Sequence, residues 1–390
     1  MHDFTYYNPV KVLFGKGQIK QLAQLISPNK KILLTYGGGS IKANGVYQQV
    51  EQALQGYKVI EFSGIEANPD YDTLMKAVEI CRSEKIDLIL AVGGGSIIDG
   101  SKFIALAAKY SGDTWDILTK PDVVFNEAID LGAILTLPAT GSEMNSGAVV
   151  SRRSIGAKQA FMNPLVFPKF AILDPETTYS LPKRQLQNGI IDPFIHVTEQ
   201  YLTTDINSSI QDGFAEAVLK TLISVGQDIV NGTQDYDTRA NWMWAATNAL
   251  NGIIGIGVDH DWATHMIGHE LTAAYGLDHA QTLAIIAPQL WRQQSANKSA
   301  KLLKFAHNVW GLENNHADVA IKQAIIKTEE FFHSLDVKTK FADYGITVDA
   351  NKIVANLFKY SSSNLGEHQN IDAGAVKEIL TMAGEILPII

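Results

Sequence analysis

Residues 87–96, DLILAVGGGS, form an apolar run that ends in three glycines and a serine, and residues 31–40, KILLTYGGGS, repeat this pattern. A short continuous apolar run bounded by glycine predicts a strand that is buried on both faces. Glycine lets the backbone approach an anion, and the N-terminus of a following helix offers N–H groups to it. We therefore expect a nucleotide-binding sheet with a phosphate loop at each of these strand ends. The residues that we assign to a pyrophosphate are Gly93, Gly94, Gly95 and Ser96.

Further apolar runs alternate with helical patterns throughout the first half of the chain. Strands that are separated by helices predict a parallel sheet that is covered by helices on both faces. The fold class expected here is therefore α/β. The predicted strands are residues 31–36, 59–62, 87–92, 132–138 and 170–174, and the predicted helices are residues 74–84 and 100–108.

The second half of the chain has only helical patterns, and we place the domain boundary near Pro182. Pro182 suits the first turn of a short helix that ends before Gly189, and the pair Asp192-Pro193 then suits the start of another helix. We thus predict an α/β domain of residues 1–182 and an all-helical domain of residues 183–390. The longer helices are expected at residues 210–230, 238–253, 261–274, 317–334 and 373–386.

The bulk properties exclude several classes of protein. The net charge is −9 and there is no basic run, so nucleic acid is not an expected partner. The single cysteine, Cys81, excludes an internal disulfide and fits a reducing cytosol. The N-terminal residues lack the features of a signal peptide, and no apolar run approaches the ~20 residues of a membrane span. We therefore expect a cytoplasmic protein that does not bind membranes.

One aspartate and several histidines recur at the spacing of metal ligands. Asp192 and His196 are four residues apart, as are His265 and His269, so each pair shares one face of a helix. His279 follows ten residues later. Carboxylate and imidazole ligands together suit a divalent cation such as Zn²⁺ or Fe²⁺. Histidines that simply pack in a core or face solvent are the alternative interpretation.

The first glycine-rich loop bears on the choice of nucleotide. Enzymes that use NAD often place an acidic residue at a strand end, where it binds the ribose 2′-hydroxyl. The strand that ends at Tyr36 has no such acid, and Lys42 follows the loop. Backbone N–H groups, a hydroxyl and a nearby cation favour a 2′-phosphate, so we predict NADP(H). The loop residues are Gly37, Gly38, Gly39 and Ser40.

Hydroxyl groups follow the strand predicted at residues 132–138. Thr140 and Ser142 lie just beyond its carboxyl end, which is where open α/β sheets bind their ligands. A capped turn is the alternative interpretation of these two residues. Lys158 lies in a short polar stretch and is either a ligand contact or a solvent-facing side chain.

Four motifs are distinctive when taken together: GGGSIIDGSK at residues 93–102, LPATGSE at 137–143, GIIDPFIHVTEQY at 189–201 and DWATHMIGHELTAAYGLDHAQT at 261–282. They resemble the iron-containing (group III) alcohol dehydrogenase family, and most of all its NADPH-dependent branch of butanol dehydrogenases and aldehyde reductases. The likeness covers essentially the whole chain and implies the dehydroquinate synthase-like fold. Pro193 departs from the family pattern, which usually has a small helix former there.

The resemblance implies a role for each candidate site residue. His269 is implied to lie beside the metal, near the nicotinamide, without being a ligand. Asp99 and Lys102 are implied to lie near the nicotinamide end of the cofactor. The family contains iron and zinc enzymes and suggests a homodimer. The implied metal ligands are Asp192, His196, His265 and His279, and the implied cofactor contacts are the two glycine-rich loops with Asp99, Lys102, Thr136, Thr140, Ser142 and Lys158.

The function expected from these features is NADP(H)-dependent interconversion of aldehydes, such as butanal, and primary alcohols. The metal polarises the carbonyl oxygen, and His269 and Asp99 are the catalytic candidates. A lyase of the dehydroquinate synthase type is one alternative, but neither 189–201 nor 261–282 contains the lysines or arginines that a polyanionic substrate needs. A metallohydrolase would leave both GGGS loops unexplained. A non-catalytic metal or nucleotide sensor is the third alternative.

Overall fold

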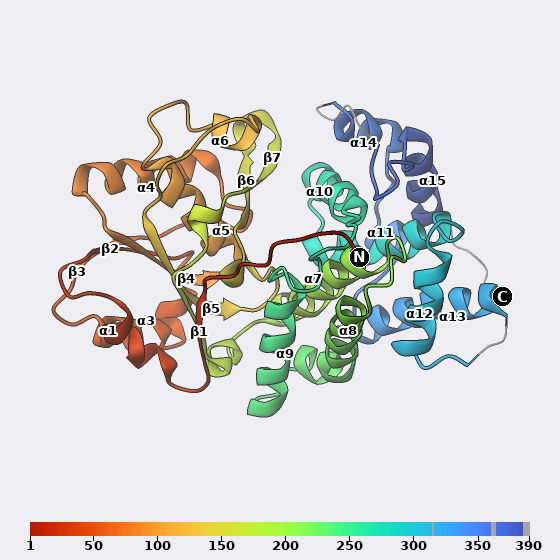
Figure 1. Cartoon of the computed structure of the whole chain (residues 1–390), viewed down its shortest axis with the longest axis horizontal. Helices are drawn as coiled ribbons and strands as arrows, with labels where there is room; N and C mark the ends of the chain where they lie inside the picture. Colours follow the sequence, from red (N-terminus) through yellow and green to blue (C-terminus); the bar gives the residue numbers. More distant parts are fainter. Residues whose placement is uncertain (314–315, 360–363, 385–390) are drawn as a thin grey trace. The chain divides into compact units, whose positions relative to one another are not determined.

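The structure, a computed structural model, describes residues 1–313, 316–359 and 364–384 (Figure 1). Contacts within the chain divide it into two compact units. The sheet unit consists of Tyr7–Pro182 and Thr233–Thr247, and the helical unit consists of Met1–Tyr6, Lys183–Gly232 and the chain from Asn248 onward. The division into domains 1–182 and 183–390 stays a prediction, and residues 385–390 of the second domain lie outside the described ones.

The sheet unit is built on a six-stranded sheet in the order β1-β8-β5-β4-β2-β3. Each neighbouring pair of strands is parallel. This parallel arrangement confirms the α/β class predicted for the first half of the chain. The strands are β1 Lys11–Phe14, β2 Lys31–Thr35, β3 Lys58–Phe62, β4 Leu88–Gly94, β5 Asp130–Leu137 and β8 Phe170–Leu173.

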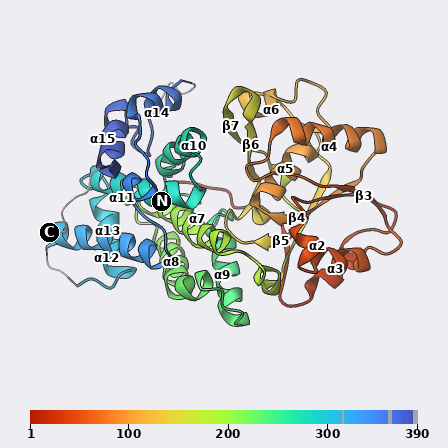
Figure 2. The same cartoon turned by 180° about the vertical axis from the view of Figure 1, so that it is seen from behind.

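Both faces of this sheet are buried. Along β2, Leu33 belongs to one apolar core, whereas its neighbours Ile32 and Leu34 belong to the other. This alternation explains the continuous apolar runs in the sequence, because each side of a strand has its own core. Figure 2 shows α2 and α3 on one face and α4 and α5 on the other. The helices are α1 Leu22–Leu25, α2 Ser40–Ala43, α3 Val46–Ala53, α4 Tyr71–Glu84, α5 Gly95–Ala107 and α6 Asp116–Thr119.

Two strands of this unit were not predicted from the sequence. β6 Gly147–Arg152 and β7 Ala157–Met162 form a separate antiparallel pair. A two-stranded ribbon has no sheet interior, so its sequence carries no long apolar run. β1 lies at the sheet edge and overlaps residues 1–13, where the sequence allows an edge strand.

The helical unit confirms the helical second half of the chain. The predicted helix at 261–274 begins two residues later than expected, and the one at 373–386 is described only to Gly384. Within residues 1–313, 316–359 and 364–384, each helix is too short or too polar for a membrane span. The helices are α7 Lys183–Tyr201, α8 Ser209–Val230, α10 Ala263–Tyr275, α11 His279–Gln293, α12 Ser299–Asn308, α13 Ala317–Ser334, α14 Ala350–Leu357 and α15 Ala373–Gly384, and α9 Tyr236–Ala249 lies mainly in the sheet unit.

The prediction of a helix break between Gly189 and Asp192 was wrong. A single helix, α7, runs through both Gly189 and Pro193. Pro193 has no N–H to donate to the carbonyl four residues earlier, which weakens a helix locally. Every residue from Gly189 to Tyr201 is buried, however, so tertiary packing outweighs the local penalty.

Candidate functional site

Three helices of the helical unit position the predicted metal ligands. Asp192 and His196 lie one turn apart on α7, His265 lies in the first turn of α10, and His279 is the first residue of α11. Gly268 allows α10 and α11 to approach closely, because a Cβ there would lie 3.0 Å from the Thr282 hydroxyl of α11. Segments that are distant in sequence thus bring their side chains to one place.

One carboxylate oxygen is the point on which three imidazoles converge. The Nε2 atoms of His196, His265 and His279 each lie 3.4 Å from Oδ1 of Asp192. This separation is longer than a good N–H···O hydrogen bond of about 2.7–3.2 Å. It equals the edge of about 3.4 Å that a tetrahedron has when its centre lies about 2.1 Å from each ligand atom. The ligand atoms of Asp192, His265 and His279 all lie within 4.8 Å of one another, as groups around one cation must, whereas His196 meets this cluster through its 3.4 Å approach to Asp192.

Because this cluster is buried, the negative charge on Asp192 must be balanced by neighbouring groups. Asp192 is 2% exposed and His196 is 6% exposed. Burial alone would favour the neutral carboxyl group, but the adjacent imidazoles of His196, His265 and His279 hold the pKa of Asp192 well below its usual range. A buried carboxylate needs a positive partner, and either protonated imidazoles or a divalent cation supplies it.

His269 lies beside the four converging side chains. Its ring stacks on that of His279 with centroids 5.4 Å apart, and it meets the ring of His265 edge-on at 6.1 Å. Among the described residues, the cluster whose ligand atoms lie within 4.8 Å of one another comprises Asp192, His265 and His279 and includes neither His196 nor His269; of these two, His196 has its Nε2 3.4 Å from Asp192. The placement of His269 agrees with a neighbour of the metal rather than a ligand.

Glu199 is a site residue that the sequence reasoning missed. One of its oxygens accepts a hydrogen bond from the backbone N–H of His265 at 3.1 Å, and the other contacts Nδ1 of the same residue. Glu199 lies seven residues after Asp192, which places both on one face of α7. This helical spacing from Asp192 was the feature of the sequence that could have identified Glu199 as a site residue.

The second glycine-rich segment joins β4 directly to α5 in the sheet unit. β4 continues to Gly94 and α5 begins at Gly95, so the helix predicted from residue 100 starts five residues earlier. Packing requires these glycines: a Cβ on Gly93 would lie 2.4 Å from the Ile97 side chain, and one on Gly95 would lie 2.3 Å from the Thr140 hydroxyl. The N–H groups of the first helical turn have no partner within the helix and are suited to an anion.

Asp99 joins this segment to the loop after β5. Its carboxylate accepts hydrogen bonds from the Ser142 hydroxyl at 2.6 Å and from the backbone N–H of Val149 at 2.9 Å. Burial raises the pKa of Asp99, and nearby Lys102 opposes the shift. The hydroxyl of Thr140 in turn accepts the N–H of Ser142 at 3.2 Å. The structure therefore brings the predicted residues of α5 and of this loop together.

Lys102 is buried and donates hydrogen bonds to neutral oxygen atoms. Its Nζ donates to Oδ1 of Asn145 at 2.9 Å and to the carbonyl of Gly147 at 2.7 Å. Burial lowers the pKa of Lys102 to about 8, despite the opposing charges of Asp99 and Glu143. Lys102 is therefore close to its titration range at neutral pH.

Lys158 reaches the glycine-rich segment through a residue that was not predicted. Nζ of Lys158 donates to Oδ1 of Asn68 at 3.0 Å, and the N–H of Asn68 donates to Oγ of Ser96 at 3.2 Å. Asn68 has a positive φ of 55° and precedes a proline. An Asn-Pro pair is typical of a turn, so the sequence could have predicted a turn at this position. Thr136, the remaining predicted contact, lies buried in β5.

The first glycine-rich loop is open on its outer side. A Cβ on Gly38 or Gly39 would meet nothing within 4 Å, although the φ of 96° at Gly39 favours glycine. The loop thus has room for a ligand.

Lys42, the cation expected near this loop, pairs with Glu61, an acidic residue that the sequence analysis did not identify. Lys42 donates to Glu61 of β3 at 3.1 Å, and Glu61 also accepts the hydroxyls of Tyr36 and Tyr47. Hydrogen bonds from these tyrosines, followed by that from Lys42, lower the pKa of Glu61. The sequence analysis looked for an acidic residue at the end of β2, whereas Glu61 lies within the neighbouring strand β3.

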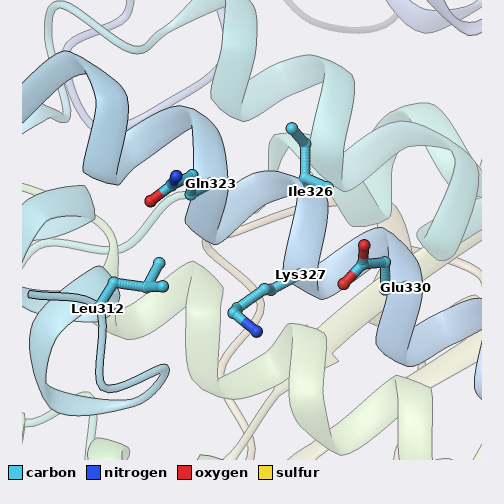
Figure 3. Close-up of a pocket in the computed structure, with 5 residues that line it drawn as sticks. All are labelled: Leu312, Gln323, Ile326, Lys327 and Glu330. Carbon is cyan, nitrogen blue, oxygen red and sulfur yellow. The ribbon is translucent and has the colours of Figure 1, made fainter. Parts of the chain in front are cut away.

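Two surface hollows lie away from these residues. Figure 3 shows one in the helical unit, with a volume of about 260 Å³. The other, of about 250 Å³, lies in the sheet unit. Neither is lined by a predicted site residue. The first is lined by Leu312, Gln323, Ile326, Lys327 and Glu330, and the second by Phe14, Ala240, Asn241 and Trp244.

Both halves of the chain match one protein family. Residues 9–175 match the iron-containing alcohol dehydrogenase domain, and residues 187–384 match the C-terminal domain of the Fe-containing alcohol dehydrogenase family. The NADPH-dependent aldehyde reductase YqhD of Escherichia coli is 50% identical, over 98% of this chain and all of that protein. NADH-dependent butanol dehydrogenase A of Clostridium acetobutylicum is 39% identical, over 97% and 99% of the two chains.

Solved structures share the fold. The substrate- and cofactor-free aldehyde reductase YqhD from E. coli has a TM-score of 0.93 and 47% identity, with 98% of this chain and 100% of that chain covered. NADH-dependent butanol dehydrogenase A from Thermotoga maritima also has a TM-score of 0.93, with 32% identity and 99% of each chain covered. The predicted resemblance and fold are confirmed.

The lowered pKa of Lys102 predicts a specific pH dependence of stability. Because the unfolded lysine has a pKa of 10.5, folding disfavours the charged form, and this penalty is complete below about pH 8. The penalty decreases as the pH rises toward 10.5, so this lysine makes the fold more stable with rising pH. Relative to Lys102→Met, the wild type should gain about 2 kcal/mol of unfolding free energy between pH 7 and pH 9.5.

Urea denaturation of both proteins at the two pH values measures this gain. The control is Lys220→Met, at an exposed lysine of α8, which should show a pH-independent difference from the wild type. A pH-independent difference for Lys102→Met would contradict the prediction.

Proposed function

Because the chain belongs to the iron-containing alcohol dehydrogenase family, we propose that it is a metal-dependent, NADP(H)-dependent reductase of aldehydes such as butanal, and that it also oxidises the corresponding primary alcohols. The observation that carries this proposal is the convergence of three imidazole Nε2 atoms on Oδ1 of Asp192, each at 3.4 Å. The aldehyde reductase and butanol dehydrogenases among its relatives support the substrate class.

The proposed metal ligands are Asp192, His196, His265 and His279. One carboxylate and three imidazoles suit either Fe²⁺ or Zn²⁺. When bound, the metal would act as a Lewis acid on the carbonyl oxygen of the aldehyde. The side chains of Asp192, His196 and His265 are buried, so they would hold that cation where water competes little with the substrate.

His269 is the proposed source of the proton that the product alcohol takes up on its oxygen. Its ring contacts the rings of His279 and His265, so it lies beside the proposed metal. An ordinary imidazole pKa of ~6.5 suits proton exchange near neutral pH. For Asp99, the other catalytic candidate, the contacts support a role in holding the Ser142 hydroxyl and the Val149 backbone.

The cofactor contacts proposed for the sheet unit begin at the junction of β4 and α5. The first-turn N–H groups of α5 would bind the pyrophosphate, and Lys158 with Asn68 would bind the neighbouring ribose. The open loop at Gly37–Ser40, with Lys42 close by, would bind the 2′-phosphate of NADPH. NADPH would supply the hydride, and the residues named here would fix its position.

Assembly and location complete the proposal. β1 lies at the edge of the six-stranded sheet, where an unpaired strand edge can pair with a second copy, so we propose a homodimer. A single buried cysteine fits a reducing compartment, and we propose the cytoplasm.

The metal requirement gives the first test of this function. Protein stripped of metal should not oxidise NADPH in the presence of butanal, and Fe²⁺ or Zn²⁺ should restore turnover. His279→Ala should lower the restored turnover by about a hundredfold or more, because loss of a ligand removes Lewis-acid stabilisation worth several kcal/mol. The matched control is His307→Ala, at an exposed histidine of α12, which should retain wild-type turnover. Turnover that is indifferent to metal would contradict the proposal.

The cofactor preference gives a second test. Lys42→Ala should raise the KM for NADPH about tenfold and leave that for NADH nearly unchanged, because only NADPH carries the 2′-phosphate that the cation would bind. Steady-state kinetics with both cofactors measures this difference. Lys76→Ala, at an exposed lysine of α4, is the control and should change neither KM. An equal rise for both cofactors would show that Lys42 supports the loop rather than selecting NADPH.

A further inference from the structure

Glu199 is a buried carboxylate directed at one of the proposed metal ligands. Its side chain is 3% exposed and contacts two nitrogen atoms of His265, the backbone N–H and ring Nδ1. An ionised carboxylate only accepts hydrogen bonds, so the contact with Nδ1 places the ring proton on that atom. Nε2, the other ring nitrogen, points to Asp192 at 3.4 Å.

This arrangement selects the form of His265 that can bind a metal. A neutral imidazole carries one proton, and a proton on Nδ1 leaves the lone pair on Nε2. The bond to the backbone N–H fixes the carboxylate against the first turn of α10, so the ring cannot rotate without losing a contact. Both the tautomer and the orientation of the ring therefore depend on Glu199.

A second group of buried charges fixes the same two helices. Lys298 is 1% exposed along its side chain, and its Nζ donates to the carbonyl of Leu202 just after α7 and pairs with Asp261 at 3.0 Å. Asp261 accepts the N–H of Ala263 at the start of α10, and its own N–H donates to the Glu199 carbonyl at 2.8 Å. Glu367 pairs with Lys298 from a separate segment.

We propose that Glu199 is a positioning residue for metal binding, which holds His265 as the Nδ1–H tautomer with Nε2 directed at the cation. This inference rests on the proposed metal site and adds a residue to it. Carboxylate partners of ligand histidines act in this way generally, and their loss typically weakens metal binding about 10–100-fold. The Lys298 group keeps α7 and α10 in register so that the Glu199 contact persists.

A purely structural role for Glu199 predicts a different outcome. A buried hydrogen-bonded carboxylate can also be retained for packing alone, and its replacement then lowers the stability of the fold. In that case the protein that remains folded would bind metal normally. Metal affinity and ligand geometry, measured on folded protein, therefore separate the two roles.

The variant Glu199→Gln tests the proposal. Glutamine keeps the shape but replaces one of the two carboxylate oxygens with an N–H₂ group, and because the ring Nδ1 and the backbone N–H contact different oxygens of Glu199, one of the two acceptors is lost. Its amide N–H₂ group favours the opposite tautomer, with the proton on Nε2. Using Co²⁺ as the probe, we expect the dissociation constant measured against a chelator to rise about 10–100-fold, with altered visible absorption bands.

Two further variants make the outcome decisive. Glu199→Asp keeps a carboxylate and should recover affinity to within about tenfold of the wild type, even if Glu199→Gln folds poorly. Glu216→Gln makes the same chemical change in α8, where Glu216 accepts the Tyr201 hydroxyl at 2.9 Å and contacts no proposed ligand. It should bind Co²⁺ as the wild type does.

Three results would overturn the inference. The first is a folded Glu199→Gln protein with wild-type affinity and spectrum. The second is an equal loss of affinity in Glu216→Gln, which would indicate a general effect of destabilisation. The third is a wild-type chain that binds no Co²⁺, which would overturn the proposed metal site together with this inference, whereas the first two results leave that site intact.

Discussion

The buried carboxylate of Asp192 is the constraint on which the helical unit depends. A charge that is almost fully removed from water is tolerated only where positive groups surround it, and here three imidazoles do so at a common distance of 3.4 Å. These groups come from α7, α10 and α11, so the site requires the three helices to pack in one arrangement. Gly268 permits the close approach of α10 and α11, and the extensive burial of α7 keeps that helix continuous through Pro193.

The sheet unit is governed by a different constraint, the close packing at the end of β4. Gly93, Gly94 and Gly95 each face a neighbour that leaves no room for a side chain. The glycines therefore serve the packing of strand on helix as well as access for an anion. The loop at Gly38 and Gly39 has open space instead, and this contrast supports the assignment of a ligand phosphate there. The two similar sequences thus have different structural reasons for their glycines.

The sequence predicted those features whose signal is local. Buried strands such as β2 and β4 appear as apolar runs, and Asp192, His196 and His265 stand out by helical spacing. α11 was missed because it is largely apolar and buried and because Pro288, a residue that usually ends a helix, lies inside it.

Partners that lie across the fold could not be predicted. Glu61 reaches Lys42 from a neighbouring strand, and Asn68 reaches Lys158 from a turn ninety residues earlier. Such pairs depend on strand order and packing, which no single segment encodes. Glu199 could be predicted only in part. Its helical spacing from Asp192 is visible in the sequence, whereas its contact with His265 depends on how α7 and α10 pack.

Anomalous X-ray diffraction from crystals of the metal-loaded protein tests whether the four proposed ligands bind one cation. We expect one strong anomalous peak about 2.0–2.2 Å from an oxygen of Asp192 and from Nε2 of His196, His265 and His279, with His269 outside ligand distance. A peak elsewhere, or one from which any of these four residues is absent, would show that the proposed site is wrong.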